Sequence, residues 1–121
     1  MSDKHYIACD LGAESGRVIL GTVSDGKVTL DELHRFPNGA IRIQNSLRWN
    51  LLAIFEELKK GLQKVAKQDC APTSLSVDSW GVDYVFSNAN QPILSLPYQY
   101  LSLIQSPSPR DRQKSRMPSS A

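Results

Sequence analysis

The dipeptide Asp25-Gly26 constrains the fold of this chain more than any other feature of the sequence. It separates two runs of strand-forming residues, 17–23 and 27–36, and the second run alternates imperfectly between apolar and polar positions. A type I′ turn needs positive φ at both central residues, which Asp-Gly readily adopts, so the pattern predicts a β-hairpin. The alternation slips near Asp31, where we expect a β-bulge.

Further elements follow from the apolar pattern on either side of this hairpin. The short apolar run 6–11 predicts a buried strand that pairs with 17–23, which completes an antiparallel three-stranded meander. Apolar residues at helical spacing predict a helix over 51–67, capped at its N-terminus by Asn50. Residues 74–78 alternate again and predict a strand beside the first.

The order of these elements defines the fold class. A meander, a helix and a further strand predict an α/β domain, since the helix must cover one face of the sheet. Gly61 lies inside the predicted helix and is expected to permit a close approach to the sheet. Residues 37–49 are mostly polar and are expected to form a loop, and a smaller hairpin is expected near 84–94.

Charge and composition narrow the classes of partner. The net charge of +2 is weak and comes from basic residues crowded into 110–116, so nucleic acid is not an expected partner. No apolar run approaches the ~20 residues of a membrane span. Cys9 and Cys70 form no CxxC pair. Reduced thiols and the lack of an apolar leader predict a cytoplasmic protein with no membrane partner.

The segment from Asp10 to Arg17, DLGAESGR, is the first candidate site. A strand ends in a carboxylate, turns through two glycines and returns as a strand. Successive N–H groups in such a turn can form an anion-binding concavity, and Ser15 and Arg17 can add donors. Asp10 offers a carboxylate to Mg²⁺, a cation that prefers oxygen ligands. The alternative is a plain hairpin turn with an exposed arginine.

The segment DSWGVD is the second candidate site. Two carboxylates flank an indole and a glycine, and the residues concerned are Asp78, Trp80, Gly81 and Asp83. Aromatic faces pack on the C–H groups of sugars and carboxylates accept bonds from hydroxyls, so the segment favours a sugar site. The alternative is a turn with a core tryptophan and two solvated acids. Trp49 is interpreted as a hydrophobic staple at the helix start, and His34 as a structural residue.

Taken together, these segments resemble the rhamnulokinase branch of the FGGY carbohydrate kinases. The resemblance covers residues 6 to 100, in family order and at about family spacing. Its matching pieces are DLGAESGR, His34-Arg35-Phe36 with Asn38-Gly39, Trp49, DSWGVD, and the final LPYQY.

The resemblance implies a partial ribonuclease-H-like domain of the actin and hexokinase superfamily. It also implies ATP-dependent phosphorylation of L-rhamnulose or a related ketose with Mg²⁺. By position, Asp10 serves the metal–phosphate region and Gly81 contacts the sugar. The ATP phosphates are expected over Gly12, Ala13, Glu14, Ser15, Gly16 and Arg17. A carboxylate facing a triphosphate would repel it, so we expect the Glu14 side chain to point away.

The resemblance stops after Tyr100. We therefore expect residues 1–100 to form a partial kinase N-terminal domain. Residues 101–121, rich in Ser, Pro and Arg, are expected to be a disordered tail read in a wrong frame. The family's catalytic base lies beyond the matching part, so no catalytic residue is assigned and enzymatic activity stays open. The alternatives are a non-catalytic nucleotide-binding or interaction fragment, an actin-like ATPase remnant, or a kinase for another ketose or polyol.

Overall fold

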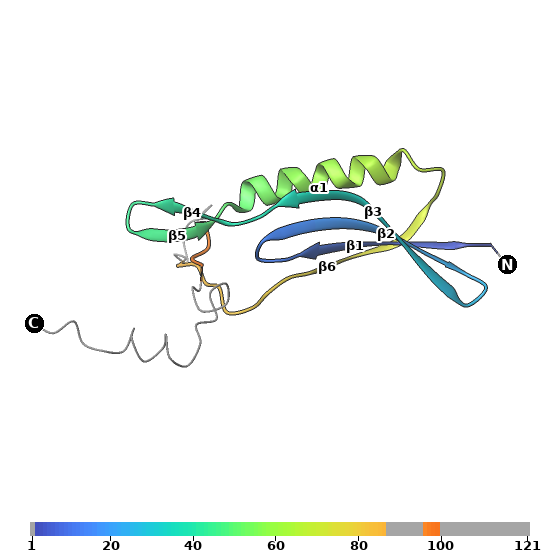
Figure 1. The fold of residues 1–121 in the computed structure, drawn as a ribbon, viewed down its shortest axis with the longest axis horizontal. Coiled ribbons are helices and arrows are strands. Elements are labelled where there is room, and N and C mark those ends of the chain that lie inside the picture. Colours follow the sequence, from blue (N-terminus) through green and yellow to red (C-terminus); the bar gives the residue numbers. More distant parts are fainter. Residues whose placement is uncertain (1, 87–95, 100–121) are drawn as a thin grey trace, which may run out of the picture.

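The computed structural model describes residues 2–86 and 96–99, which form a four-stranded sheet, one helix and a separate small hairpin (Figure 1). The helix lies along one face of the sheet, and the small hairpin extends beyond the helix start. The elements are β1 (Lys4–Leu11), β2 (Ser15–Ser24), β3 (Lys27–Pro37), β4 (Ala40–Ile43), β5 (Ser46–Trp49), α1 (Leu51–Ala66) and β6 (Pro72–Asp78).

The sheet has the strand order β3-β2-β1-β6. β1, β2 and β3 are antiparallel neighbours, and β6 pairs parallel with β1. The predicted meander, helix and adjoining strand are therefore confirmed, and with them the α/β class. The ribonuclease-H-like assignment remains a prediction.

The turn between β2 and β3 has the predicted geometry, because φ is 49° at Asp25 and 74° at Gly26. The predicted bulge lies two residues beyond Asp31. Val18 pairs with His34 while Ile19 pairs with Glu32, so Leu33 is the extra residue. Such an extra residue bends the strand and increases its twist.

The core lies between α1 and the sheet. Its buried members are Cys9, Val18, Leu20 and Val65, with Leu58 and Leu62 of α1 packed against them. Gly61 brings the helix close, because a Cβ built there would lie 2.7 Å from the Cβ of Val18. The helix begins as predicted, since the Ala53 N–H donates to Oδ1 of Asn50 at 3.2 Å.

The prediction of a loop over 37–49 is wrong, because β4 and β5 form an antiparallel hairpin there. Gln44 takes positive φ, 52°, at the tip, which the two-residue connection requires. The alternation of Ile41, Ile43, Leu47 and Trp49 around Gln44-Asn45 was the available signal. The polar residues between these apolar positions made the segment look like a loop.

Other expectations fall partly or wholly outside the described residues. Of the smaller hairpin predicted near 84–94, only Tyr84 to Phe86 is described, and Tyr84 forms an isolated bridge with Tyr98. The predicted tail over 101–121 lies outside the described part. Within that part, α1 is neither long nor apolar enough to cross a membrane.

Candidate functional site

The turn of residues 12–14 joins β1 to β2 and forms the centre of the first candidate site. The Gly12 N–H donates to the carbonyl of Ser15 at 2.9 Å, and a Cβ on Gly12 would lie 2.8 Å from that oxygen. In the described part of the chain, the N–H groups of Ala13 and Glu14 donate to no acceptor. The turn therefore offers two adjacent main-chain donors to an anion.

Asn38 holds this turn from outside. Its side-chain amide donates to the carbonyl of Gly12 at 2.8 Å, and its N–H donates to the carbonyl of Glu14 at 2.9 Å. Because Asn38 engages the carbonyls at both ends of the turn, those of Gly12 and Glu14, the turn has a fixed shape. Sequence reasoning included Asn38 among the matching pieces but gave it no role at the site.

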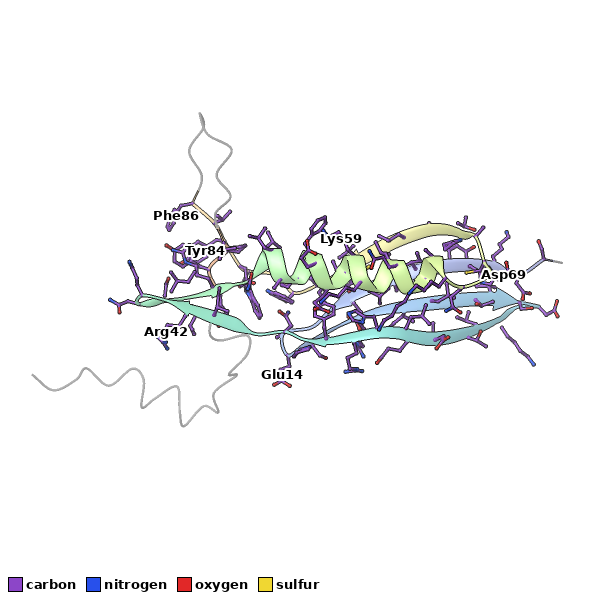
Figure 2. The ribbon with its side chains drawn as sticks, turned by 90° about the horizontal axis from the view of Figure 1, so that it is seen from above. Glu14, Arg42, Lys59, Asp69, Tyr84 and Phe86 are labelled. Carbon is purple, nitrogen blue, oxygen red and sulfur yellow. The ribbon has the colours of Figure 1, made fainter. Side chains whose placement is uncertain are left out.

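Two residues of the first segment offer no side chain to a bound anion. The Glu14 side chain is exposed and extends outward from the turn (Figure 2). Gly16 is buried under the ring of Phe36, where an added Cβ would lie 2.6 Å from Cε2 of that ring. Gly16 therefore serves packing of β2 against β3.

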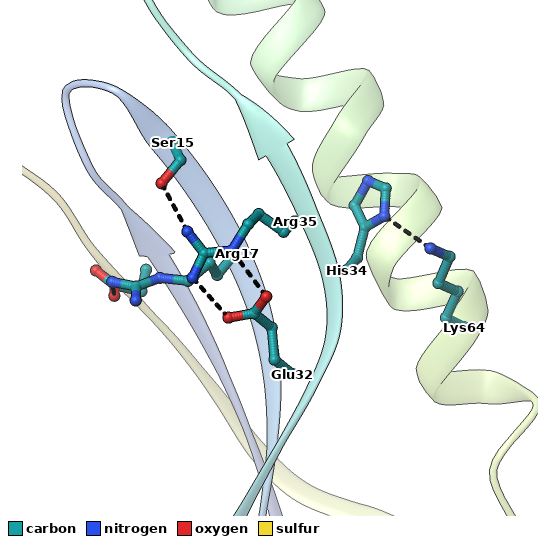
Figure 3. Close-up of polar contacts among 7 residues, drawn as sticks. Ser15, Arg17, Glu32, His34, Arg35 and Lys64 are labelled. Carbon is teal, nitrogen blue, oxygen red and sulfur yellow. Dashed lines mark hydrogen bonds and ion pairs between the residues drawn. The ribbon is translucent and has the colours of Figure 1, made fainter.

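The polar side chains of the segment face one another across the strands. Arg17 forms an ion pair with Asp10, its cross-strand partner. Within the described residues, the buried Nε of Arg17 has no acceptor. Ser15 Oγ accepts a bond from Nη1 of Arg35 at 3.2 Å (Figure 3). Asp10, the predicted metal ligand, and Arg17, a predicted phosphate ligand, are thus bonded to each other.

Arg35 extends this charged row toward the sheet edge. It donates twice to the Glu32 carboxylate, at 2.8 and 2.9 Å (Figure 3). These bonds, and then the nearby positive charge of Arg35, lower the pKa of Glu32 below its ordinary value. In turn, the hydrogen bonds to Glu32, and then its negative charge, raise the pKa of Arg35. Both groups are charged at neutral pH, so Arg35 carries a fixed positive charge beside Ser15.

The two candidate segments meet at the end of the sheet. Asp78, the last residue of β6, is in register with Asp10 of the parallel strand β1. Residues in register on parallel strands share a face, so both carboxylates lie on the side that carries Arg17. The described residues contain no cluster of three or more potential metal ligands. Mg²⁺ at Asp10 would therefore need oxygens from phosphate or water as well.

The second segment forms one wall of a pocket of about 190 Å³. Trp80 packs against Trp49 with ring centroids 4.3 Å apart, and its Nε1 donates to the Asp83 carboxylate. Sequence reasoning assigned Trp49 to helix packing and missed its place in the pocket. The lining residues are Leu11, Trp49, Leu51, Ile54, Ser79, Trp80, Asp83 and Pro97.

The pocket adjoins the turn of residues 12–14, because Leu11 lines the pocket and directly precedes Gly12. Gly81 is open, with no atom within 4 Å of the position a Cβ would take, and Val82 has φ of 67°. Cys9 contributes no nucleophile here, since burial raises the pKa of its thiol. A turn with two open main-chain donors thus lies beside a pocket that combines two aromatic side chains with the carboxylate of Asp83.

Comparison with known proteins shows that the chain is similar to carbohydrate kinases. It resembles rhamnulokinases in particular, as the ordered motifs predicted. It is 42% identical over 97 residues to "Rhamnulokinase" of Ligilactobacillus salivarius, covering 80% of this chain and 20% of that protein. It is 43% identical over 102 residues to "Rhamnulokinase" of Pectobacterium atrosepticum, covering 83% and 21%. The protein of that name from Bacteroides thetaiotaomicron is 37% identical over 97 residues, covering 80% and 20%.

The chain thus spans about one fifth of the length of the curated relatives it matches. No family model matches it.

Proposed function

We propose that this chain carries the first phosphate-binding turn and part of the sugar pocket of a rhamnulokinase-type kinase. The observation that carries the proposal is the pair of free N–H groups, at Ala13 and Glu14, beside the pocket of Trp49 and Trp80. The likeness to proteins named rhamnulokinase supports ATP and L-rhamnulose, or a related ketose, as the ligands. We expect the protein to act in the cytoplasm.

On the nucleotide side, the turn binds phosphate oxygens through its main-chain donors. Gly12 lets the backbone close tightly, and Asn38 keeps the carbonyls of the turn away from the anion. Arg17 adds a charged donor when its bond to Asp10 opens, and Asp10 then becomes available to Mg²⁺. Bound Mg²⁺ would neutralise phosphate charge.

On the sugar side, Trp80 offers a ring face to C–H groups and Asp83 offers carboxylate oxygens to hydroxyls. Gly81 leaves space for a ligand next to the backbone. Asp78 stands between the two subsites, at the end of β6. We propose that Asp78, Trp80, Gly81 and Asp83 contact the sugar.

The proposal is tested by calorimetric titration of the chain with Mg²⁺–ATP. Gly12→Val should abolish binding, because its side chain collides with the carbonyl of Ser15 and opens the turn. Glu14→Ala should leave binding nearly intact, since only the backbone of Glu14 takes part. The same two changes are made at the matching positions of a full-length relative. If they have the same effects there, the loss of binding does not come from poor folding of the 121-residue chain. Equal losses from both changes would contradict the assignment.

A second candidate is a non-catalytic nucleotide-binding fragment. The bond between Asp10 and Arg17 favours it, because the carboxylate that would hold Mg²⁺ is engaged, while the main-chain donors of Ala13 and Glu14 stay open to a phosphate. The two functions separate on sugar binding. A chain that binds ATP but neither rhamnulose nor a related ketose or polyol would support the second candidate.

A further inference from the structure

Ser15 of β2 and Arg35 of β3 are bonded to each other at the end of the sheet that carries the turn of residues 12–14. Nη1 of Arg35 donates to Oγ of Ser15 at 3.2 Å, across the pair of antiparallel strands (Figure 3). Ser15 directly follows Glu14, whose N–H group is one of the two open main-chain donors. The Ser15 hydroxyl therefore lies next to the proposed position of the phosphate.

The chemistry of the two groups decides the direction of this bond. A guanidinium has only donors, whereas a hydroxyl has one proton to donate and two lone pairs that accept. Oγ of Ser15 is therefore the acceptor, and its own proton takes no part in the bond with Arg35. Within the described residues this hydroxyl donates to no acceptor, so its proton is available to a bound anion.

Glu32 fixes the orientation of the Arg35 guanidinium. Nε and Nη2 both donate to the Glu32 carboxylate, at 2.8 and 2.9 Å, from one edge of the planar group. A two-point contact of this kind holds the plane of a guanidinium. Nη1 lies on another edge of the group and donates to Ser15. Glu32, Arg35 and Ser15 thus form a chain of hydrogen bonds that ends at the turn.

We propose that Arg35 is a positioning residue, which orients the Ser15 hydroxyl toward a phosphate bound by the two open N–H groups. The inference rests on the proposed function and adds a third donor to the same site. A hydroxyl that accepts a bond from a cation is a stronger donor, because hydrogen bonds in a chain polarise one another. Glu32 acts only through Arg35 and contacts no ligand.

Calorimetric titration of the full 121-residue chain with Mg²⁺–ATP tests this inference through the sign of one effect. Glu32→Gln removes a negative charge near the turn, so charge alone would make the binding of an anion tighter. Positioning predicts the opposite result. An amide offers the guanidinium a single acceptor oxygen, and Arg35 then loses its fixed orientation. We expect Glu32→Gln to weaken binding about threefold.

Arg35→Lys and Ser15→Ala extend the test. Lysine keeps the charge but loses the planar fork, so Arg35→Lys should weaken binding about tenfold. Ser15→Ala should weaken it about as much, and the double variant no more than either single change, since both remove the same bond. Arg42→Lys is the matched control, because Arg42 is exposed on the separate hairpin of β4 and β5. It should change the affinity by less than about twofold, as most exposed side chains do.

Amide NMR separates positioning from damage to the fold. The N–H signals of Ala13 and Glu14 in the ligand-free chain should keep their positions in Arg35→Lys, since Asn38 holds the turn. A shift of these signals would assign the loss to a distorted turn and overturn the inference. So would full-strength binding by Arg35→Lys, tighter binding by Glu32→Gln, or additive losses in the double variant. Failure of the unchanged chain to bind Mg²⁺–ATP would instead refute the proposed function, and the inference with it.

Discussion

At the scale of single residues, Gly61 is a position where the packing of the helix on the sheet leaves no room for a side chain. It lies on the buried face of α1, and a Cβ there would lie 2.7 Å from the Cβ of Val18, which is fully buried. We predict that Gly61→Ala destabilises the chain by about 1–3 kcal/mol, since overpacking outweighs the gain in helix propensity. Denaturation by urea measures this.

Gly39→Ala is the matched control for that prediction. No atom lies within 4 Å of the Cβ position at Gly39, so the same chemical change should alter stability by less than about 1 kcal/mol. If Gly61→Ala were as harmless as Gly39→Ala, the close approach of helix and sheet would be contradicted.

The two tryptophans provide a second prediction at this scale. They are the only tryptophans in the chain, and both line the same pocket. A sugar that packs on Trp80 should exclude water from its indole and shift the emission to shorter wavelength. We expect rhamnulose to cause this shift and ATP alone to cause none, as measured by fluorescence titration. Trp80→Phe should remove the response, and a shift that survives this change would contradict the sugar site.

At the scale of elements, a polar clamp joins α1 to β3. Lys64 Nζ donates to Nδ1 of His34 at 2.9 Å (Figure 3), and Nε2 of His34 lies 2.7 Å from the Glu57 carboxylate. The donor from Lys64 assigns the ring proton to Nε2, so a neutral imidazole donates to Glu57. Glu57 also accepts a bond from Lys60 at 2.7 Å.

This clamp predicts how stability depends on pH. Bonds from Lys60, and then from His34, hold the pKa of Glu57 below its ordinary value of 4.5, and Arg35 does the same for Glu32. The unfolded chain binds these protons at higher pH than the folded chain. Stability from both groups is therefore complete above pH 4.5 and is lost as the pH falls below it.

Urea midpoints at about pH 6 and about pH 4 measure this loss. Glu57→Gln should make the fall smaller, because the amide does not titrate. Glu14→Gln changes an exposed carboxylate without an ion pair in the described part, and it should leave the fall unchanged. An equal fall in all three proteins would contradict the role of Glu57.

The elements were predictable where one local signal dominated. Asp25-Gly26 fixed the β2–β3 turn, Asn50 fixed the helix start, and the apolar stripe of α1 fixed its length. The β4–β5 hairpin was missed because Gln44-Asn45 is a weak turn signal and Arg42 and Arg48 interrupt the apolar pattern. The site was only half predictable, because cross-strand partners depend on register. Register alone pairs Asp10 with Arg17 and brings Asp78 beside Asp10.

At the scale of the whole molecule, apolar surface remains open on both faces of the sheet. Val28 is 65% exposed and Leu30 71% exposed on the face opposite α1. On that face a hollow of about 340 Å³ is lined largely by apolar side chains, among them Tyr6, Ile19 and Val23. Exposed apolar patches of this kind bind partners or promote aggregation. We expect the chain alone to be marginally stable.

The last prediction is that the 121-residue chain alone does not phosphorylate rhamnulose. Phosphoryl transfer needs the nucleotide phosphates held from more than one side and a base that accepts the proton of the attacking hydroxyl. The described residues offer one phosphate turn. Of the carboxylates near it, Asp10 is engaged by Arg17 and Asp83 by Trp80, and Asp78 is assigned above to the sugar. Absence of a positioned base alone costs about 10²–10⁴-fold.

Turnover and thermal unfolding of the same purified sample test this prediction together. We expect rhamnulose-dependent ATP consumption at background level and a broad, low-temperature transition. A full-length relative such as the Pectobacterium atrosepticum rhamnulokinase serves as the positive control for the assay. The chain spans 21% of that protein, so adding the control protein's remaining part in trans asks whether groups from that part give turnover. Cooperative unfolding with sugar-dependent turnover by the chain alone would refute the prediction, because one turn and one partial pocket would then suffice for catalysis.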